Sequence, residues 1–148
     1  NLALQSGWSA LDQAIDQNPL RVAPGMAVID AIAQMNQRGA SCALVMAENT
    51  LVGIFTERDL MLRVVHAGRD PALTTMRAVM TTEPDTIAAE APVAHAIRAM
   101  DELSYRYLPV LDGDRCVGVI STRHVPLSDV LELKDELQAR HDIAERMW

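Results

Sequence analysis

Aromatic residues are scarce in this 148-residue sequence, in which Phe, Trp and Tyr together make up 3%. The hydrophobic core must therefore be built from Val, Ile, Leu, Met and Ala. No apolar run approaches the roughly 20 residues of a membrane-spanning helix, and the N-terminus lacks the charged-then-apolar order of a signal peptide. We therefore expect no membrane partner and a cytoplasmic location. The first residue is Asn1 rather than Met, which leaves open whether the chain is part of a longer protein.

Clustered basic residues are also missing, since 13 Lys and Arg stand against 20 Asp and Glu and the net charge is −7. Nucleic acids and anionic membranes are bound by clustered Lys and Arg, so the sequence argues against both as main partners and leaves room only for a small anion site. The two cysteines, Cys42 and Cys116, lie in apolar runs and are predicted to be buried and reduced. The histidines are scattered without metal-ligand spacing, so no metal site is expected: His66, His95, His124 and His141.

An internal repeat is the strongest feature that the sequence does contain. "GIFTERDL" (residues 53–60) returns as "GVISTRHV" (residues 118–125), a shift of 118 − 53 = 65 positions. At this shift residues 19–60 align with residues 84–125 without a gap, and 10 of the 42 aligned pairs are identical. Because a half of about 60 residues buries little surface alone, we expect the two halves to share a core.

Each half has the same predicted order of elements, β-α-β-β-α. The first helix of each half has apolar residues at i, i+3, i+4 and i+7, namely Val28, Ala31, Ile32 and Met35, then Val93, Ala96, Ile97 and Met100. The sequence therefore predicts an α/β (α+β) fold of two repeats packed about a pseudo-twofold axis, with extra terminal helices. The predicted parts are an N-terminal helical segment (1–18), repeat 1 (19–67), a linker (68–83), repeat 2 (84–133) and a C-terminal helical tail (134–148).

Thr56 and Asp59 have the spacing of a helix capping box directly after a predicted strand. The Thr56 hydroxyl can accept from the N–H of the third helical residue, while the Asp59 carboxylate reaches back to the N–H of Thr56. The same junction suits a phosphate at the helix N-terminus and a ribose diol on the carboxylate. Gly53 and Gly118 lie in mid-strand, which indicates the close approach of another backbone or of a ligand. On the residues alone, the structural and the ligand-binding interpretation both stay open.

The doubled pattern, "GIFTERDL", "YLPVLD" (107–112) and "AVMTTEPDTI" (78–87) together resemble a tandem pair of CBS domains, also called a Bateman module. The likeness covers residues 19–133. It implies a regulatory module without enzymatic activity that requires no cofactor. It also implies an adenosine-containing ligand in the cleft between the repeats, such as AMP, ADP, ATP or S-adenosylmethionine, and a homodimeric assembly.

The resemblance implies that Asp59 holds the ribose and that the phosphate lies near Thr56, with Arg58 beside them. The base is expected against the other repeat, at Asp85, Thr86, Ile87, Tyr105, Tyr107 and Pro109. An apolar surface role for the two tyrosines is the open alternative.

The second repeat departs from this pattern. His124 stands where the first copy has its carboxylate and cannot accept from two hydroxyls, while Pro126 removes an N–H near the start of the following helix. A second site is therefore expected to be empty, weak or altered in specificity. Its candidate residues are Val22, Cys42, Arg106, Ser121 and His124. Arg106 is either a phosphate contact or an ordinary surface arginine.

The tail "LSDVLELKDELQARHDIAERMW" (127–148) has a strong helical pattern. It is expected to pack on its own domain, to extend a dimer contact, or to couple the module to an effector domain or protein. No nucleophile–base pair, glycine-rich phosphate loop or carboxylate pair indicates catalysis. Two functions remain, a nucleotide-sensing regulatory module and a structural dimerisation module with vestigial clefts.

Overall fold

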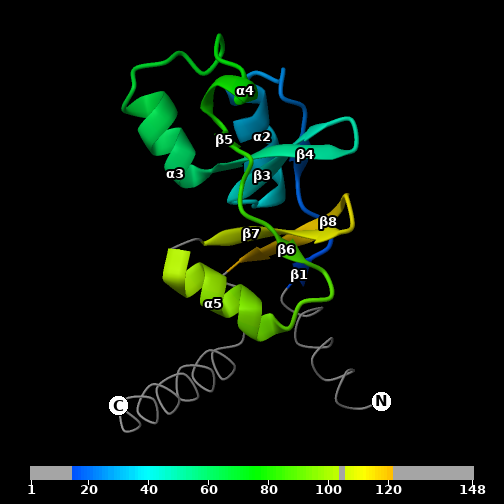
Figure 1. Cartoon of the computed structure of the whole chain (residues 1–148). Coiled ribbons are helices and arrows are strands. Elements are labelled where there is room, and N and C mark those ends of the chain that lie inside the picture. The colour runs from blue at the N-terminus through cyan, green and yellow to red at the C-terminus, as the bar shows by residue number, and fades with distance from the viewer. Residues whose placement is uncertain (1–14, 104–105, 122–148) are drawn as a thin grey trace, which may run out of the picture.

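The computed structural model describes residues 15–103 and 106–121, which form two four-stranded sheets stacked on each other (Figure 1). The strands are β1 (Ile15–Asp16), β2 (Arg21–Val22), β3 (Cys42–Ala47), β4 (Thr50–Thr56), β5 (Thr81–Thr82), β6 (Ile87–Ala88), β7 (Tyr107–Asp112) and β8 (Arg115–Ser121). The helices are α2 (Val28–Arg38), α3 (Glu57–Asp59), the π-helical η1 (Leu60–Val65), α4 (Met76–Val79) and α5 (Val93–Leu103). The strand orders are β2-β3-β4-β5 and β1-β8-β7-β6.

The sequence repeat is reproduced in the elements. β3 and β7, β4 and β8, and α2 and α5 all begin and end 65 residues apart. The register irregularity recurs as well, since β3–β4 pairing shifts between Val45 and Met46 and β7–β8 pairing between Val110 and Leu111. The predicted β-α-β-β order is confirmed in both halves. The helix expected to close the second half and the expected C-terminal helical tail lie outside the described residues.

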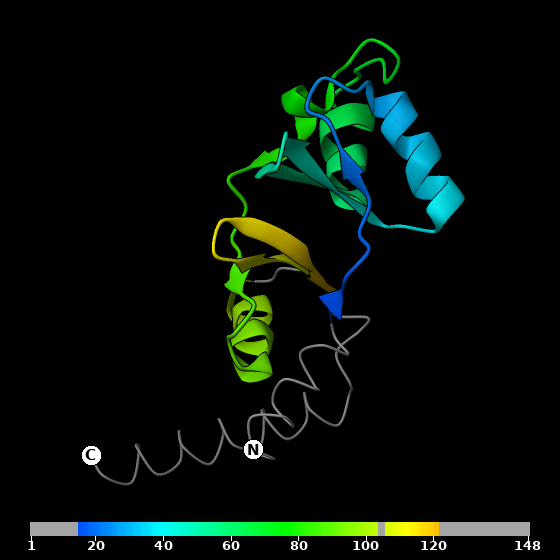
Figure 2. The same cartoon turned by 90° about the vertical axis from the view of Figure 1, so that its right-hand side faces the viewer.

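The strand that leads into each repeat pairs with the sheet of the other repeat. β1 runs antiparallel to β8, and β5 runs antiparallel to β4. Figure 2 shows β1, in dark blue, beside the strands of the second sheet. These strands correct the predicted boundaries, because β5 and α4 fall in the expected linker and β1 falls in the expected N-terminal helix. Two-residue strands have no hydrophobic period of their own, so only their pairing partner reveals them.

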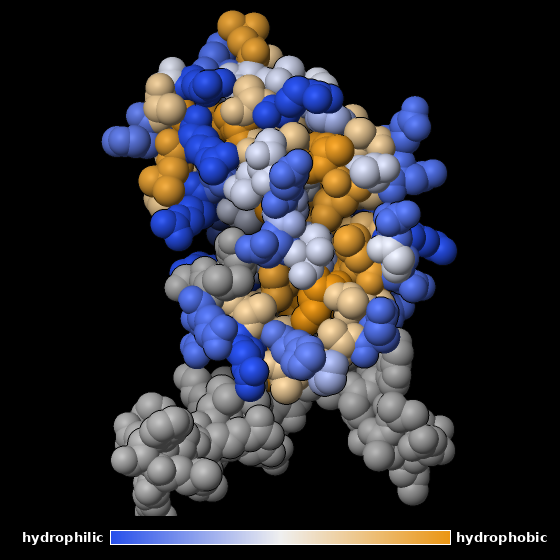
Figure 3. Space-filling view, in the orientation of Figure 1, coloured by the Kyte–Doolittle hydropathy of each residue, from blue (hydrophilic) through white to orange (hydrophobic). Residues whose placement is uncertain are grey.

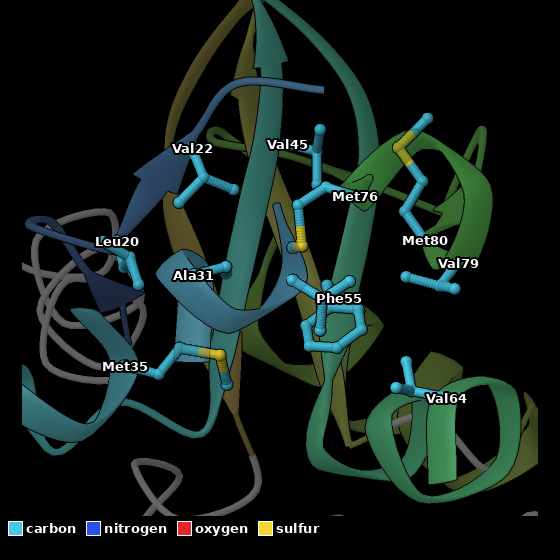
Figure 4. Packing of buried hydrophobic residues seen from close by; sticks show 12 residues of the cluster. Leu20, Val22, Ala31, Met35, Val45, Phe55, Val64, Met76, Val79 and Met80 are labelled. Atoms are coloured by element: carbon cyan, nitrogen blue, oxygen red, sulfur yellow. The ribbon is translucent and has the colours of Figure 1, made fainter. Parts of the chain in front are cut away.

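Apolar residues form three buried clusters. On the outer face of the first sheet, Phe55 is fully buried among side chains of α2, η1 and α4 (Figure 4). On the outer face of the second sheet, α5 contributes Ala96, Ile97 and Met100, as their helical spacing predicts. The third cluster draws on both sheets and is the shared core: Cys42, Leu44, Ile54, Cys116 and Val119.

We call β1 and β5 the crossing strands, because each pairs with the sheet of the other repeat. Gly53 allows β5 to approach β4 closely, and Gly118 allows β1 to approach β8. A Cβ atom on Gly53 would lie 2.5 Å from Met80 Sδ and 2.9 Å from the carbonyl oxygen of Thr81, next to β5. A Cβ atom on Gly118 would lie 2.6 Å from Ile15 Cγ2, next to β1. Both positions therefore admit only a residue without a side chain. The predicted close approach is confirmed, and in both cases another segment of the chain makes it.

Candidate functional site

The junction between β4 and α3 forms the predicted capping box. The Asp59 backbone N–H donates to Thr56 Oγ1 (3.3 Å), and the Thr56 backbone N–H donates to Asp59 Oδ2 (2.9 Å). The Thr56 hydroxyl also donates to Oδ2 at 3.2 Å. Asp59 is 8% exposed, and burying a polar side chain is costly unless its atoms are hydrogen-bonded, so these contacts offset the burial of the carboxylate. The structure thus brings Thr56 and Asp59 together, and Arg58 lies exposed on the intervening turn.

The other oxygen of Asp59 faces β5. Thr81 donates from Oγ1 to Asp59 Oδ1 at 3.3 Å, and Arg63 Nε lies 3.6 Å from the same oxygen. Arg63 also donates from Nη1 to the carbonyl oxygen of Met80 at 2.8 Å. Sequence reasoning missed Thr81, because it lies in the expected linker. The ion pair with Arg63 could have been predicted, because Arg63 follows Asp59 by four residues, about one helical turn.

The residues expected around the base differ in their exposure to solvent. Asp85 and Thr86 are exposed on the connection from β5 to β6, whereas the Ile87 side chain is buried in the cluster beneath α5. Tyr107 is half-buried, and its hydroxyl lies 2.5 Å from the Ser41 hydroxyl. Pro109 is fully buried in β7 opposite Val119, so its side chain offers no surface to a ligand. Tyr105 lies outside the described residues.

An open groove of about 1270 Å³ is lined by residues of both halves. The connection from β1 to β2 and the two hairpins β3–β4 and β7–β8 line it, through Arg21, Val22, Glu48, Asp114, Arg115 and Cys116 among others. Arg21 donates from Nη2 to the Cys116 carbonyl oxygen at 3.3 Å. Two arginines and two carboxylates in one lining do not favour an anion. The repeat could have indicated Arg21, because it aligns with Thr86 (86 − 65 = 21).

Of the second set of candidates, only Val22 lines this groove. Val22, Cys42 and Ser121 are buried, Arg106 is exposed, and His124 lies outside the described residues. The second set of candidates therefore stays a prediction.

Both cysteines are held as neutral thiols. Burial raises the pKa of Cys42 to about 12, and the charge of Asp16 adds to the effect. Burial also raises the pKa of Cys116, against the lowering effects of a backbone hydrogen bond with Gly118 and of the Arg21 charge. Since the thiolate is the reactive form, neither side chain is prepared for nucleophilic attack at pH 7.

Residues 15–103 and 106–121 contain no group of three His, Cys, Asp or Glu residues that could hold a metal ion. Within the same ranges, no helix has both the length and the apolarity needed to cross a membrane.

The sequence profile of the CBS domain matches the chain twice, over residues 12–66 and 76–125. The chain belongs to the CBS domain family. Both matches contain a glycine-led junction, Gly53–Asp59 in the first and Gly118–His124 in the second. The two matches begin at residues 12 and 76, a few residues before β1 and β5 respectively. Each match therefore includes the short strand that pairs with the sheet of the other repeat.

Relatives and solved structures extend this result. The CBS domain-containing protein CBSCBSPB1 of Arabidopsis thaliana is 36% identical over 112 residues, which cover 74% of this chain but 20% of the relative. The CBS domain pair of protein MJ0100, solved with 5′-methylthioadenosine and S-adenosyl-L-methionine, has a TM-score of 0.70 at 20% identity and covers 78% of this chain and 94% of its own. A hexameric CBS-CP12 protein from bloom-forming cyanobacteria has a TM-score of 0.72 at 24% identity, covering 90% and 83%.

Proposed function

We propose that this chain is a regulatory module that binds an adenosine-containing ligand, of the AMP, ADP, ATP or S-adenosylmethionine class, in the cleft between the two repeats, with Asp59 as a contact. One observation carries the proposal, namely a buried carboxylate at the start of a helix, held in place by Thr56 and facing the strand that crosses to the other half. An ionised carboxylate accepts from two hydroxyls at once, as a ribose diol requires. The complex of the MJ0100 pair with two adenosine compounds supports this ligand class.

In this proposal the ribose binds Asp59 and the phosphate lies near Thr56. The base lies along the exposed connection at Asp85 and Thr86, where backbone groups between β5 and β6 are accessible, with Tyr107 at its edge. Ile87 and Pro109 contribute backbone only, because both side chains are buried. The second cleft is the weaker site. It lacks a matching carboxylate at residue 124, and the open groove that Val22 lines has balanced charges.

A structural dimerisation module is the second candidate, and an apolar surface favours it. Met61 (58% exposed), Leu62 (45%) and Val65 (69%) project from η1 into solvent. Figure 3 shows apolar side chains at the edge of the molecule where Figure 1 places the helix after β4. Large apolar patches are rare on monomers, so we propose that two copies pair through η1. The two candidates do not exclude each other, since a regulatory module can also be a dimer. We further propose that the C-terminal tail couples the module to an effector domain or protein.

A thermal-shift panel tests the ligand class. AMP, ADP, ATP and S-adenosylmethionine are each added in excess, with guanosine monophosphate and orthophosphate as matched controls. A ligand at 100 times its Kd stabilises the folded state by about 2.7 kcal/mol, which raises the midpoint of a domain of this size by several degrees. A shift with at least one adenosine compound and none with the controls is expected. No shift with any adenosine compound would leave the dimerisation module as the better account.

A further inference from the structure

The first glycine-led segment holds β5 in two ways. Gly53 lets β5 approach closely, and the Asp59 carboxylate accepts a hydrogen bond from Thr81 in β5. Thr81 belongs to β5, and Arg63 binds both Asp59 and the carbonyl oxygen of Met80, directly before β5. Asp59 therefore fixes the end of α4 and the start of β5 to the helix that follows β4.

The Asp59 carboxylate accepts three hydrogen bonds from protein groups and forms one ion pair. A carboxylate offers about four lone-pair positions. Oδ2 accepts from the Thr56 N–H (2.9 Å) and the Thr56 hydroxyl (3.2 Å), while Oδ1 faces the Thr81 hydroxyl (3.3 Å) and Arg63 Nε (3.6 Å). A ligand that donates two hydroxyls must therefore replace at least one of these partners. The two longest contacts are both on Oδ1, and both involve the β5 segment.

We propose that Thr81 and Arg63 are positioning residues that hold Asp59 and that compete with the ligand's hydroxyls for Oδ1, so that binding releases β5 from its clamp. The inference rests on the proposed function and adds a regulatory step to it. Residues 83–86 join β5 to β6, which pairs with β7 in the second sheet. Release of β5 therefore transmits occupancy of the first cleft to the other half. Thr81 and Arg63 set the affinity for the ligand without contacting its base.

Calorimetry with AMP tests the competition. Thr81→Val removes the hydroxyl at nearly constant shape, so ribose no longer has to displace it, and AMP should bind about 2- to 10-fold tighter than to wild type. Thr82→Val is the matched control, because Thr82 is the exposed neighbour in the same strand. 2′,3′-Dideoxyadenosine monophosphate cannot donate to Asp59, so Thr81→Val should leave its affinity unchanged. AMP binding by Thr81→Val that is equal to or weaker than binding by Thr82→Val would overturn the competition.

Hydrogen exchange without added nucleotide tests the clamp separately. Asp59→Ala and Arg63→Met should both accelerate amide exchange across residues 79–83, whereas Arg69→Met, at an exposed arginine, should not. AMP added to wild type should also accelerate exchange in this segment. If wild type binds no compound of the adenosine panel, the proposed function fails and the release step with it, whereas the exchange of Asp59→Ala still decides the clamp. If wild type binds another compound of the panel but not AMP, the proposed function stands and that compound replaces AMP in both experiments. Unchanged exchange in both variants would overturn the clamp.

Discussion

The hydroxyl groups of Ser41 and Tyr107 lie 2.5 Å apart and join the residue before β3 to the first residue of β7. This hydrogen bond links the two halves beside the shared core, against which Tyr107 packs. Tyr107→Phe should lower the free energy of unfolding by about 1 kcal/mol, since one partly buried hydrogen bond is lost.

A double-mutant cycle with Ser41→Ala separates this bond from other effects of the substitutions. Urea unfolding of the four proteins should give a coupling energy of about 0.5–1.5 kcal/mol. A coupling energy near zero would show that the contact adds nothing to the association of the two halves.

Gly53→Ala and Gly118→Ala should each destabilise the fold by about 1–3 kcal/mol, because the new Cβ atom meets β5 or β1. Gly25→Ala is the matched control, since a Cβ atom there meets nothing within 4 Å. It should change the free energy of unfolding by no more than about 0.5 kcal/mol. Equal effects at all three glycines in thermal unfolding would contradict the close approach of the crossing strands.

The repeat made most of the fold predictable. Helical spacing around Ala31 and Ala96 and the doubled glycine-led phrase are local patterns, and they gave the right elements 65 residues apart. β1 and β5 could not be found this way, because each is two residues long and exists through its partner in the other half.

The candidate site was predictable only in its local part. The capping box of Thr56 and Asp59 lies within four consecutive residues, so its spacing is visible in the sequence. Thr81 reaches Asp59 across 22 positions, and Ser41 reaches Tyr107 across 66. The first contact depends on the pairing of β5 with β4, and the second on the packing of the two sheets, neither of which a local sequence pattern specifies.

The stability of the protein should fall as the pH rises above 9. Because the pKa of Cys42 is raised from 9.0 to about 12, the folded state keeps this proton while the unfolded chain loses it. The stabilisation is therefore complete below pH 9 and is lost between about pH 9 and 12, with a slope of at most about 1.4 kcal/mol per pH unit. Urea unfolding from pH 8 to pH 10.5 measures this slope.

Cys42→Ala should reduce that slope and leave a smaller one from Cys116, whose pKa is raised as well. Identical slopes for wild type and Cys42→Ala would mean that this thiol does not carry the pH dependence.

Light scattering tests the proposed pairing through η1. We expect a mass near twice 16.2 kDa for wild type and near 16.2 kDa for Met61→Glu, because a charge is then buried in the interface. Gln37→Glu adds the same charge on an exposed position of α2 and should leave the dimer intact. A wild-type mass near 16.2 kDa at micromolar concentration would instead show that parts of the same chain cover this surface.

Calorimetric titration with the most strongly stabilising compound of the panel tests the central claim, that Asp59 holds the ribose of an adenosine ligand. Wild type should bind one ligand per chain, and Asp59→Ala should bind at least tenfold more weakly, since a charge-assisted hydrogen bond contributes about 1.5–3 kcal/mol. Asp101→Ala, at an exposed carboxylate on α5, should bind within twofold of wild type, and thermal unfolding of each variant confirms that it is folded at the temperature used. Binding by folded Asp59→Ala as tight as that of wild type would contradict the account.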